Sequence, residues 1–330
     1  MCTSIIARFS NKMFFTMPPK LLQEIRKYNF FILLFLYGCK SDSPKLIPSQ
    51  TMPTDCWYRQ WEMFFKVENS FYEEASTEFV KLTETDCLLN PKVFSNGLFA
   101  MLKSGKENEA NPLFSNGSEE DKRAFCFAYG KEYDKLCSEI KPEIVSKPYL
   151  RDSILRLYVR DQYSRGGDIR QLIERYNMDT TGLSMLLYRD SDHENEEHLK
   201  KLITTNGFPT ANQVGKDGMD GVFYIVQHSS DINWQKSVLA KYEELLNDGS
   251  TDKSMYAYLS DRINIKLGNA QLYGTQVKNL HFENNEVEFF PIEDSIRIDE
   301  RRMAFDLEPL EFYKKLILKA YSGRFNDVKK

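Results

Sequence analysis

The sequence predicts a mainly α-helical protein (α+β) with a small antiparallel β element. Apolar residues recur at helical spacing through most of the chain, and their period changes from 3.6 to 2 residues only after Gly268. The 23 Phe and 18 Tyr residues favour a real core over disorder. We therefore expect an N-terminal helical bundle or repeat-like module, followed by a helical domain that carries a small antiparallel β-hairpin.

Residues 1–38 have the plan of a secretory signal. Basic residues within 20–27 precede an apolar run over 30–37, which a small residue follows at the point of cleavage. The run is too short to cross a bilayer as a helix, which needs roughly 20 apolar residues. Translation can start as late as Met17 without loss of any part that a signal needs. We therefore expect export.

The end of this signal, Leu36-Tyr37-Gly38-Cys39, resembles the lipobox of bacterial lipoproteins, although Tyr37 stands where a small residue is usual. The resemblance implies that Cys39 is acylated and becomes the first residue. Residues 39–54 are polar and contain Pro and Ser, as expected of a flexible tether. Lys40 favours the outer membrane by the same resemblance, with the face of the membrane left open. The alternative is a short buried strand or helix in a cytosolic protein.

Composition and cysteine usage narrow the class of protein. The 44 basic and 48 acidic residues are interspersed without a basic stripe, so we expect no nucleic acid partner. Four further cysteines lie before residue 140, and their even number favours two disulfides over four buried thiols. They permit three pairings. No spacing typical of zinc ligands is present, and we expect no metal or cofactor. These four residues are Cys56, Cys87, Cys126 and Cys137.

Residues 55–147 are predicted to form the helical module with these four cysteines. Around residues 94–114 an apolar helix, a Gly-Lys turn and a second helix weakly resemble one tetratricopeptide-type hairpin, and an irregular bundle is the alternative. We expect a helix over about 119–140. It would place Cys126 and Cys137 on one face, because they are eleven residues apart.

Residues 148–322 are predicted to form a second, mainly helical domain, followed by a tail over 323–330. Asp231 is a suitable N-cap for a helix over 232–246, and Thr251 or Asp252 is a suitable N-cap for a helix that runs to 267. The expected helices run from 150 to a stop at Gly166-Gly167, over 169–176, over 194–205, around 222–226, over 232–246 and from 251 or 252 to 267.

The β element is predicted near the end of this domain. Residues 276–282 and 286–290 alternate around Asn284-Asn285, as in a hairpin. Ile296 and Ile298 suggest another short extended piece. Pro309 then begins a last helix.

A set of short motifs within about 149–320 resembles an uncharacterised bacterial family, a domain of unknown function. This resemblance implies domain boundaries and candidate residues, and it implies no activity. The motifs are Arg160-Asp161-Gln162, Gly207-Phe208-Pro209-Thr210, Val226-Gln227-His228, Tyr258-Leu259, Asp261-Arg262, Tyr273-Gly274-Thr275-Gln276, and Asp299 with Arg301-Arg302.

His228 is the residue best suited to catalysis. It follows an apolar helix and lies near Asp231, which could orient the imidazole and raise its basicity. Gln227, Asp161 and Gln162 could complete a polar pocket. In the alternative reading, His228 caps carbonyls at a helix end, and Asp231 caps the next helix.

Further candidates for ligand binding follow in the sequence. The guanidinium of Asp261-Arg262 could bind an anionic ligand, or the pair could face solvent or tie the helix to the hairpin. Tyr273 and Gln276 lie at a helix-to-strand joint, where they could line a pocket or anchor the hairpin.

The sequence is compatible with two alternative functions. The first is a membrane-anchored, non-catalytic cell-envelope protein, whose helical module contacts a protein partner and whose second domain binds a ligand or partner. The second is a periplasm-facing hydrolase with His228 as general base and Asp231 or Asp161 orienting it. No nucleophile elbow or phosphate-binding loop is present, which favours the first.

Overall fold

The computed structural model describes residues 54–85, 87–141, 143–165, 173–174, 191–247 and 251–328. Within them the protein is mainly helical with a two-stranded antiparallel sheet, which confirms the predicted fold class. No helix in these ranges combines the length and apolar character needed to cross a membrane. Several predictions fall outside the described residues. They concern Cys39, nearly all of the predicted tether, the glycine pair expected to end the helix that starts at residue 150, and most of the helix predicted over 169–176.

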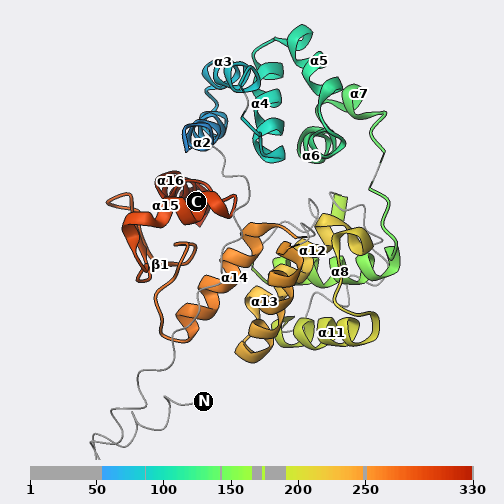
Figure 1. Cartoon of the computed structure of the whole chain (residues 1–330), viewed down its shortest axis with the longest axis vertical. Coiled ribbons are helices and arrows are strands. Elements are labelled where there is room, and N and C mark those ends of the chain that lie inside the picture. The colour runs from blue at the N-terminus through green and yellow to red at the C-terminus, as the bar shows by residue number, and fades with distance from the viewer. Residues whose placement is uncertain are drawn as a thin grey trace, which may run out of the picture. The chain divides into compact units, whose positions relative to one another are not determined.

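The N-terminal module is built around one central helix. Helix α4 packs against α2, α3, α5 and α6, and side chains such as Phe79, Leu98 and Phe125 are fully buried between them. These helices are α2 (Thr54–Glu68), α3 (Tyr72–Thr83), α4 (Pro91–Lys103), α5 (Glu107–Asn116) and α6 (Glu119–Tyr129), followed by the short α7 (Asp134–Cys137) (Figure 1).

The helix predicted over 119–140 is wrong in its length. Helix α6 ends at Tyr129, and the short α7 begins only at Asp134. Cys126 and Cys137 form a disulfide with their Cα atoms 5.5 Å apart. Eleven residues of continuous helix would separate them by about 16 Å. The chain therefore turns back between the two cysteines.

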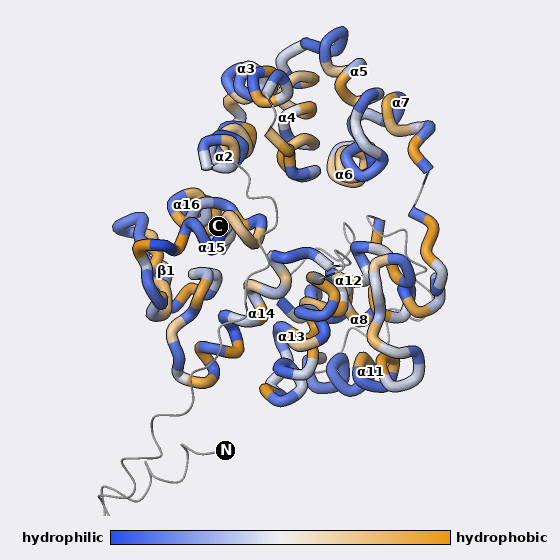
Figure 2. The backbone as a smooth tube through the Cα atoms, viewed as in Figure 1, coloured by the Kyte–Doolittle hydropathy of each residue, from blue (hydrophilic) through white to orange (hydrophobic). Residues whose placement is uncertain are grey.

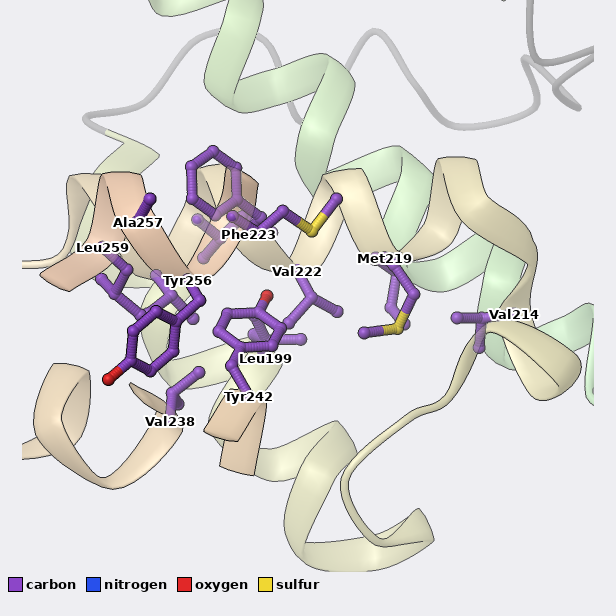
Figure 3. Close-up of a cluster of buried hydrophobic side chains, with 14 of the residues drawn as sticks. Leu199, Val214, Met219, Val222, Phe223, Val238, Tyr242, Tyr256, Ala257 and Leu259 are labelled. Atoms are coloured by element: carbon purple, nitrogen blue, oxygen red, sulfur yellow. The ribbon is translucent and has the colours of Figure 1, made fainter. Parts of the chain in front are cut away.

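The second group of helices is built around α12. It consists of α8 (Pro148–Ser164), α11 (Ser191–Asn206), α12 (Ala211–His228), α13 (Ile232–Asn247) and α14 (Lys253–Lys266). Figure 3 shows Val222 of α12 among Leu199 of α11 and Tyr242 of α13. As predicted, Asp231 and Asp252 cap α13 and α14: Asp231 accepts from the backbone N–H groups of Asn233 and Trp234, and Asp252 from that of Ser254.

Helices α8 and α12 approach closely at one glycine. A Cβ atom on Gly221 would lie only 2.8 Å from Cγ2 of Ile154 and 3.3 Å from Cβ of Tyr158. Gly221 is therefore needed for this packing distance. Seven residues after Ile154 comes Asp161, and seven after Gly221 comes His228. Seven residues are about two helical turns, so in parallel helices this contact brings Asp161 and His228 together.

The predicted hairpin is confirmed. Strands β1 (Val277–His281) and β2 (Glu286–Phe289) pair antiparallel, with a register irregularity between Val277 and Asn279. Asn285 in the turn adopts a positive φ of 53°, which asparagine tolerates better than most residues.

The extended piece predicted at Ile296 and Ile298 is wrong. Those residues lie in a 3₁₀ turn, η1 (Ser295–Arg297), and at the start of α15 (Ile298–Ala304). Asp294 turns the chain with a φ of 45°, and its carboxylate accepts a hydrogen bond from Nε of Arg297 at 2.7 Å. This local turn outweighs the β preference of two isolated isoleucines.

Helix α16 (Leu310–Val328) ends the described chain. Its Phe312 packs in a small cluster with Trp57, Trp61 and Phe64 of α2. Nε1 of Trp57 donates to the carbonyl of Leu307 at 2.9 Å. In Figure 2 hydrophobic and hydrophilic residues alternate along the helices, the pattern of helices that turn one face to a core.

Candidate functional site

The site begins with His228, the last residue of α12. Its Nδ1 lies 2.9 Å from Oδ1 and 3.0 Å from Oδ2 of Asp161 on α8. Asp161 is almost completely buried, at 1% exposure, whereas the His228 side chain keeps 18% of its surface exposed. The imidazole is therefore held from beneath by a buried carboxylate and remains accessible from outside.

This contact determines the state of the imidazole ring. A carboxylate beside Nδ1 favours the tautomer with its proton on Nδ1, which leaves a lone pair on Nε2. In the part of the chain that the structure describes, Nε2 has no hydrogen-bond partner. His228 can thus accept a proton or a hydrogen bond from a ligand at Nε2.

Among the described residues, three side chains contact the Asp161 carboxylate. Besides His228, Nη1 of Arg165 donates to its Oδ1 at 2.9 Å, and Nε2 of Gln162 donates to its Oδ2 at 2.8 Å. Arg165 continues to Asp192 at the start of α11, with Nη2 2.9 Å from Oδ2. The network fixes the Asp161 carboxylate, and through it the orientation of His228.

Aromatic rings lie beside the imidazole. Tyr224, one turn earlier on α12, has its ring centroid 6.2 Å from that of His228, and it stacks on Tyr158 of α8 at 5.1 Å. Burial, followed by the charges of Asp220 and Asp161, raises the pKa of Tyr224. Its hydroxyl therefore stays protonated at neutral pH.

Gln227 directly precedes His228 in the chain, and its side chain contacts Arg262 of α14. The Gln227 amide is assigned with its oxygen toward Arg262, where it accepts from Nε and Nη2 at 3.1 Å each. The opposite orientation would bring N–H groups against N–H groups. Burial, and then the charge of Arg165, lower the pKa of Arg262. Among the described residues, no carboxylate pairs with the Arg262 guanidinium.

Lys266 follows Arg262 by one turn of α14. Its Nζ donates to the carbonyl of Ser229 at 2.6 Å and to Oε1 of Gln235 at 2.9 Å. Its pKa is lowered by burial and then by the charge of Arg262. Sequence reasoning missed Lys266 and Arg165. The four-residue spacing of Arg262 and Lys266 on one helix is a signal that could have found Lys266.

Of the two carboxylates expected to orient His228, Asp231 or Asp161, the structure has Asp161 at the imidazole. Oδ1 of Asp231 caps α13 by accepting from the N–H groups of Asn233 and Trp234 at 3.0 Å each, and its Oδ2 lies 3.1 Å from Nζ of Lys200. The Trp234 N–H, and then Lys200, lower the pKa of Asp231. Asp231 thus serves the helix terminus.

Asp261 is used by the fold. It is fully buried, and its carboxylate accepts from the N–H groups of Leu272, Tyr273 and Thr275 and from the Thr275 hydroxyl, at 2.7 to 3.2 Å. Burial raises its pKa, and these hydrogen bonds oppose the rise. Asp261 therefore holds the loop between α14 and β1.

The two candidates in that loop are also internal. The Tyr273 ring is buried and packs on Phe305 with centroids 4.7 Å apart. Nε2 of Gln276 donates to the Thr275 hydroxyl at 3.1 Å, and its backbone N–H donates to Oε1 of Gln271 at 2.9 Å. Of the two readings of this joint, the geometry favours the one in which these residues anchor the hairpin.

The four cysteines of the N-terminal module lie in two disulfides. Cys56 pairs with Cys87 across 31 residues, and Cys126 pairs with Cys137 across 11. This is one of the three pairings that the sequence left open. Both bridges lie within the helical module, and neither involves the site at His228.

The second part of the chain matches a known protein family. Residues 149–326 match the model of a family described as a family of unknown function, DUF6624. This agrees with the resemblance to an uncharacterised domain over about 149–320, and it includes His228, Asp161 and Arg262. No curated protein and no solved structure matches the chain.

Proposed function

We propose that this chain, which belongs to the family of unknown function DUF6624, is a lipid-anchored envelope protein that binds a small polar ligand beside His228. The observation that supports ligand binding is the imidazole itself. Buried Asp161 orients it at 2.9 Å, and its Nε2 is unpaired within the described residues. A carboxylate fixes the imidazole through Nδ1, and Nε2 stays open. This arrangement is typical of a site that is preorganised for a ligand.

The test of ligand binding uses a thermal-shift screen of polar metabolites against the whole chain. We expect His228→Ala to abolish the shift that a hit produces in the wild type, while the unliganded melting temperature stays nearly unchanged. His281→Ala is the matched control, because His281 lies on the hairpin with half of its side chain exposed. Equal shifts in both variants would contradict a site at His228.

The anchor is proposed from the sequence. Export is supported by the signal-like leader before Cys39 and by the two disulfides, since disulfides persist in oxidising compartments. Lys40 favours the outer membrane, and either face fits the sequence. In cell fractionation, Cys39→Ala should move the protein from the membrane to the soluble fraction. Membrane attachment that survives this substitution would reject the lipid anchor.

We further propose that the N-terminal module contacts a protein partner. It carries large apolar side chains at its surface, with Phe71, Leu88 and Phe127 each more than half exposed. A photo-crosslinking amino acid at Leu88 or Phe127 should give a discrete cross-linked product in intact cells. Only diffuse products at both positions would count against a specific partner.

A second candidate is a hydrolytic enzyme, and the His228–Asp161 contact specifically favours it. A carboxylate at Nδ1 is the arrangement that lets an imidazole act as a general base through Nε2. For a substrate found by screening, His228→Ala should then reduce kcat by roughly 10²- to 10⁴-fold at unchanged melting temperature. Binding without turnover in the wild type would leave the binding function alone.

A further inference from the structure

We infer that Arg262 and Lys266, together with Gln227, form a recognition site for an oxyanion, a carboxylate or a phosphate group, at the His228 end of α12. The inference rests on the proposed ligand site and adds the chemical class of the ligand. It starts from the charges around His228 and from how each is compensated.

The carboxylates of this region already have cationic partners. Asp161 and Asp192 both bind Arg165, which bridges α8 and α11. Glu196 accepts from Nζ of Lys200 at 2.6 Å and from the Ser229 hydroxyl at 2.7 Å. In the part of the chain that the structure describes, none of these three carboxylates forms an ion pair with α14.

The two cations of α14 form no such ion pair among the described residues, and only the charge of Glu196 favours charged Lys266 from a distance. Arg262 contacts the neutral amide of Gln227, and Lys266 contacts the neutral oxygens of Ser229 and Gln235. Within the described ranges neither has a carboxylate partner. Their spacing of four residues places two positive charges on adjacent turns, where like charges repel, and burial disfavours the charge of Arg262 further. A fold that keeps this unfavourable pair gains from it when an anion binds.

The unused donors of Arg262 define the ligand geometry. A guanidinium carries five N–H groups, and the Gln227 oxygen takes one at Nε and one at Nη2. The remaining edge, formed by Nη1 and Nη2, presents two parallel N–H groups. Such a fork matches two oxygens of one carboxylate or phosphate.

The rest of the site supports this placement. Gln227, which aligns Arg262, is 5% exposed and directly precedes His228 in the chain. Nε2 of Gln235 donates to the carbonyls of Val226 and Gln227 and so fixes that helix end. Arg262 is partly exposed and Lys266 is exposed, so an ion from solvent can reach both. A ligand held by Arg262 would thus lie at the end of α12 where Nε2 of His228 is open.

The test measures binding of inorganic phosphate and of acetate to the whole chain by calorimetry and thermal shift, with sodium chloride at equal ionic strength as reference. We expect at least one of the two anions to raise the melting temperature beyond the chloride reference. Arg262→Gln should weaken that binding by roughly 10- to 100-fold, because charge-assisted hydrogen bonds are lost. A preference for phosphate or for acetate identifies the ligand group.

Two further variants separate recognition from a structural role. Arg262→Lys keeps the charge but loses the fork, and it should also weaken binding. Arg297→Gln removes an exposed arginine paired with Asp294, and it should leave binding unchanged. If Arg262 only supported the fold, Arg262→Gln would lower the unliganded melting temperature. We expect that temperature to stay equal or to rise, since a repulsive, partly desolvated charge is removed.

The inference is overturned if both anions act no more strongly than chloride, or if Arg262→Gln binds them as the wild type does. These outcomes are distinct from failure of the ligand site itself. A screening hit that depends on His228 but not on Arg262 would keep the proposed function and reject the oxyanion. Anion binding that depends on Arg262 and is unaffected by His228→Ala would keep the anion site and reject the site at His228.

Discussion

At the scale of single residues, the sequence offered two carboxylate partners for His228, and only the fold decides between them. Asp231 is three residues away and was the nearer choice, yet its carboxylate is used by the first turn of α13. Asp161 is 67 residues away and reaches the imidazole only because α8 and α12 pack together. The motifs did include both Asp161 and His228. Their pairing depends on a long-range contact that no local pattern encodes.

A pH dependence of stability is predicted for a single residue, Asp220. Its pKa is raised to about 7, first by burial and then by the charges of Asp252 and Asp217, while Lys216 opposes the rise. Among the described residues its carboxylate has no hydrogen-bond partner. Because the folded pKa lies above the ordinary value of 3.8, the folded state binds the proton more tightly. This group's stabilising contribution is complete below about pH 4 and is lost as the pH rises through 7.

Asp220→Asn should therefore stabilise the protein at pH 8 and change little at pH 4. The difference between 3.8 and about 7 sets an upper limit of about 4 kcal/mol on the gain in unfolding free energy. Urea unfolding at both pH values measures it. Asp134→Asn, at an exposed carboxylate of α7, is the control. A gain of equal size at pH 4 and pH 8 would disprove the titration of Asp220.

At the scale of elements, local signals were sufficient where one short segment decides the structure. The N-caps of α13 and α14 and the turn at Asn284-Asn285 were each predicted from a few neighbouring residues. The break after α6 was missed because a disulfide closes it, and the pairing of four cysteines cannot be read from their spacing. The prediction of extended structure at Ile296 and Ile298 was wrong because the β preference of a residue depends on a strand with which it can pair.

At the scale of elements, the close contact between α8 and α12 predicts that Gly221→Ala destabilises the protein. In Gly221→Ala the new methyl group would meet Cγ2 of Ile154 at 2.8 Å, and a β-branched side chain cannot swing away. The helices must separate, at a cost of about 1 to 3 kcal/mol in unfolding free energy. The contact between Asp161 and His228, two turns further along both helices, should loosen as well.

Chemical denaturation measures this loss, and ligand binding at His228 should weaken in parallel. Ile154→Ala in the same chain removes the opposing methyl group. The double variant should then lose less stability than the two single variants together. Strict additivity would show that the glycine is not needed for helix approach.

At the scale of the whole molecule, the covalent cross-links and the candidate site are segregated. Both disulfides close loops within the helical module, and every residue of the site lies within the DUF6624 match. Loops of 31 and 11 residues contribute about 3 to 4 kcal/mol each in the chain-entropy model. Because residues 138–330 contain no cysteine, reduction acts on the stability of α8 to α16 only through contacts with the helical module.

Paired replacement of Cys126 and Cys137 by serine should therefore loosen the module and preserve the site. In hydrogen exchange, protection should fall in α4, α5 and α6, which pack together around Phe125, and should persist in α12 and α14. Ligand or anion binding at His228 and Arg262 should keep the affinity of the wild type. If protection fell equally in α12, the two cores would unfold as one cooperative unit. The module would then stabilise the site as well as provide the proposed surface for a partner.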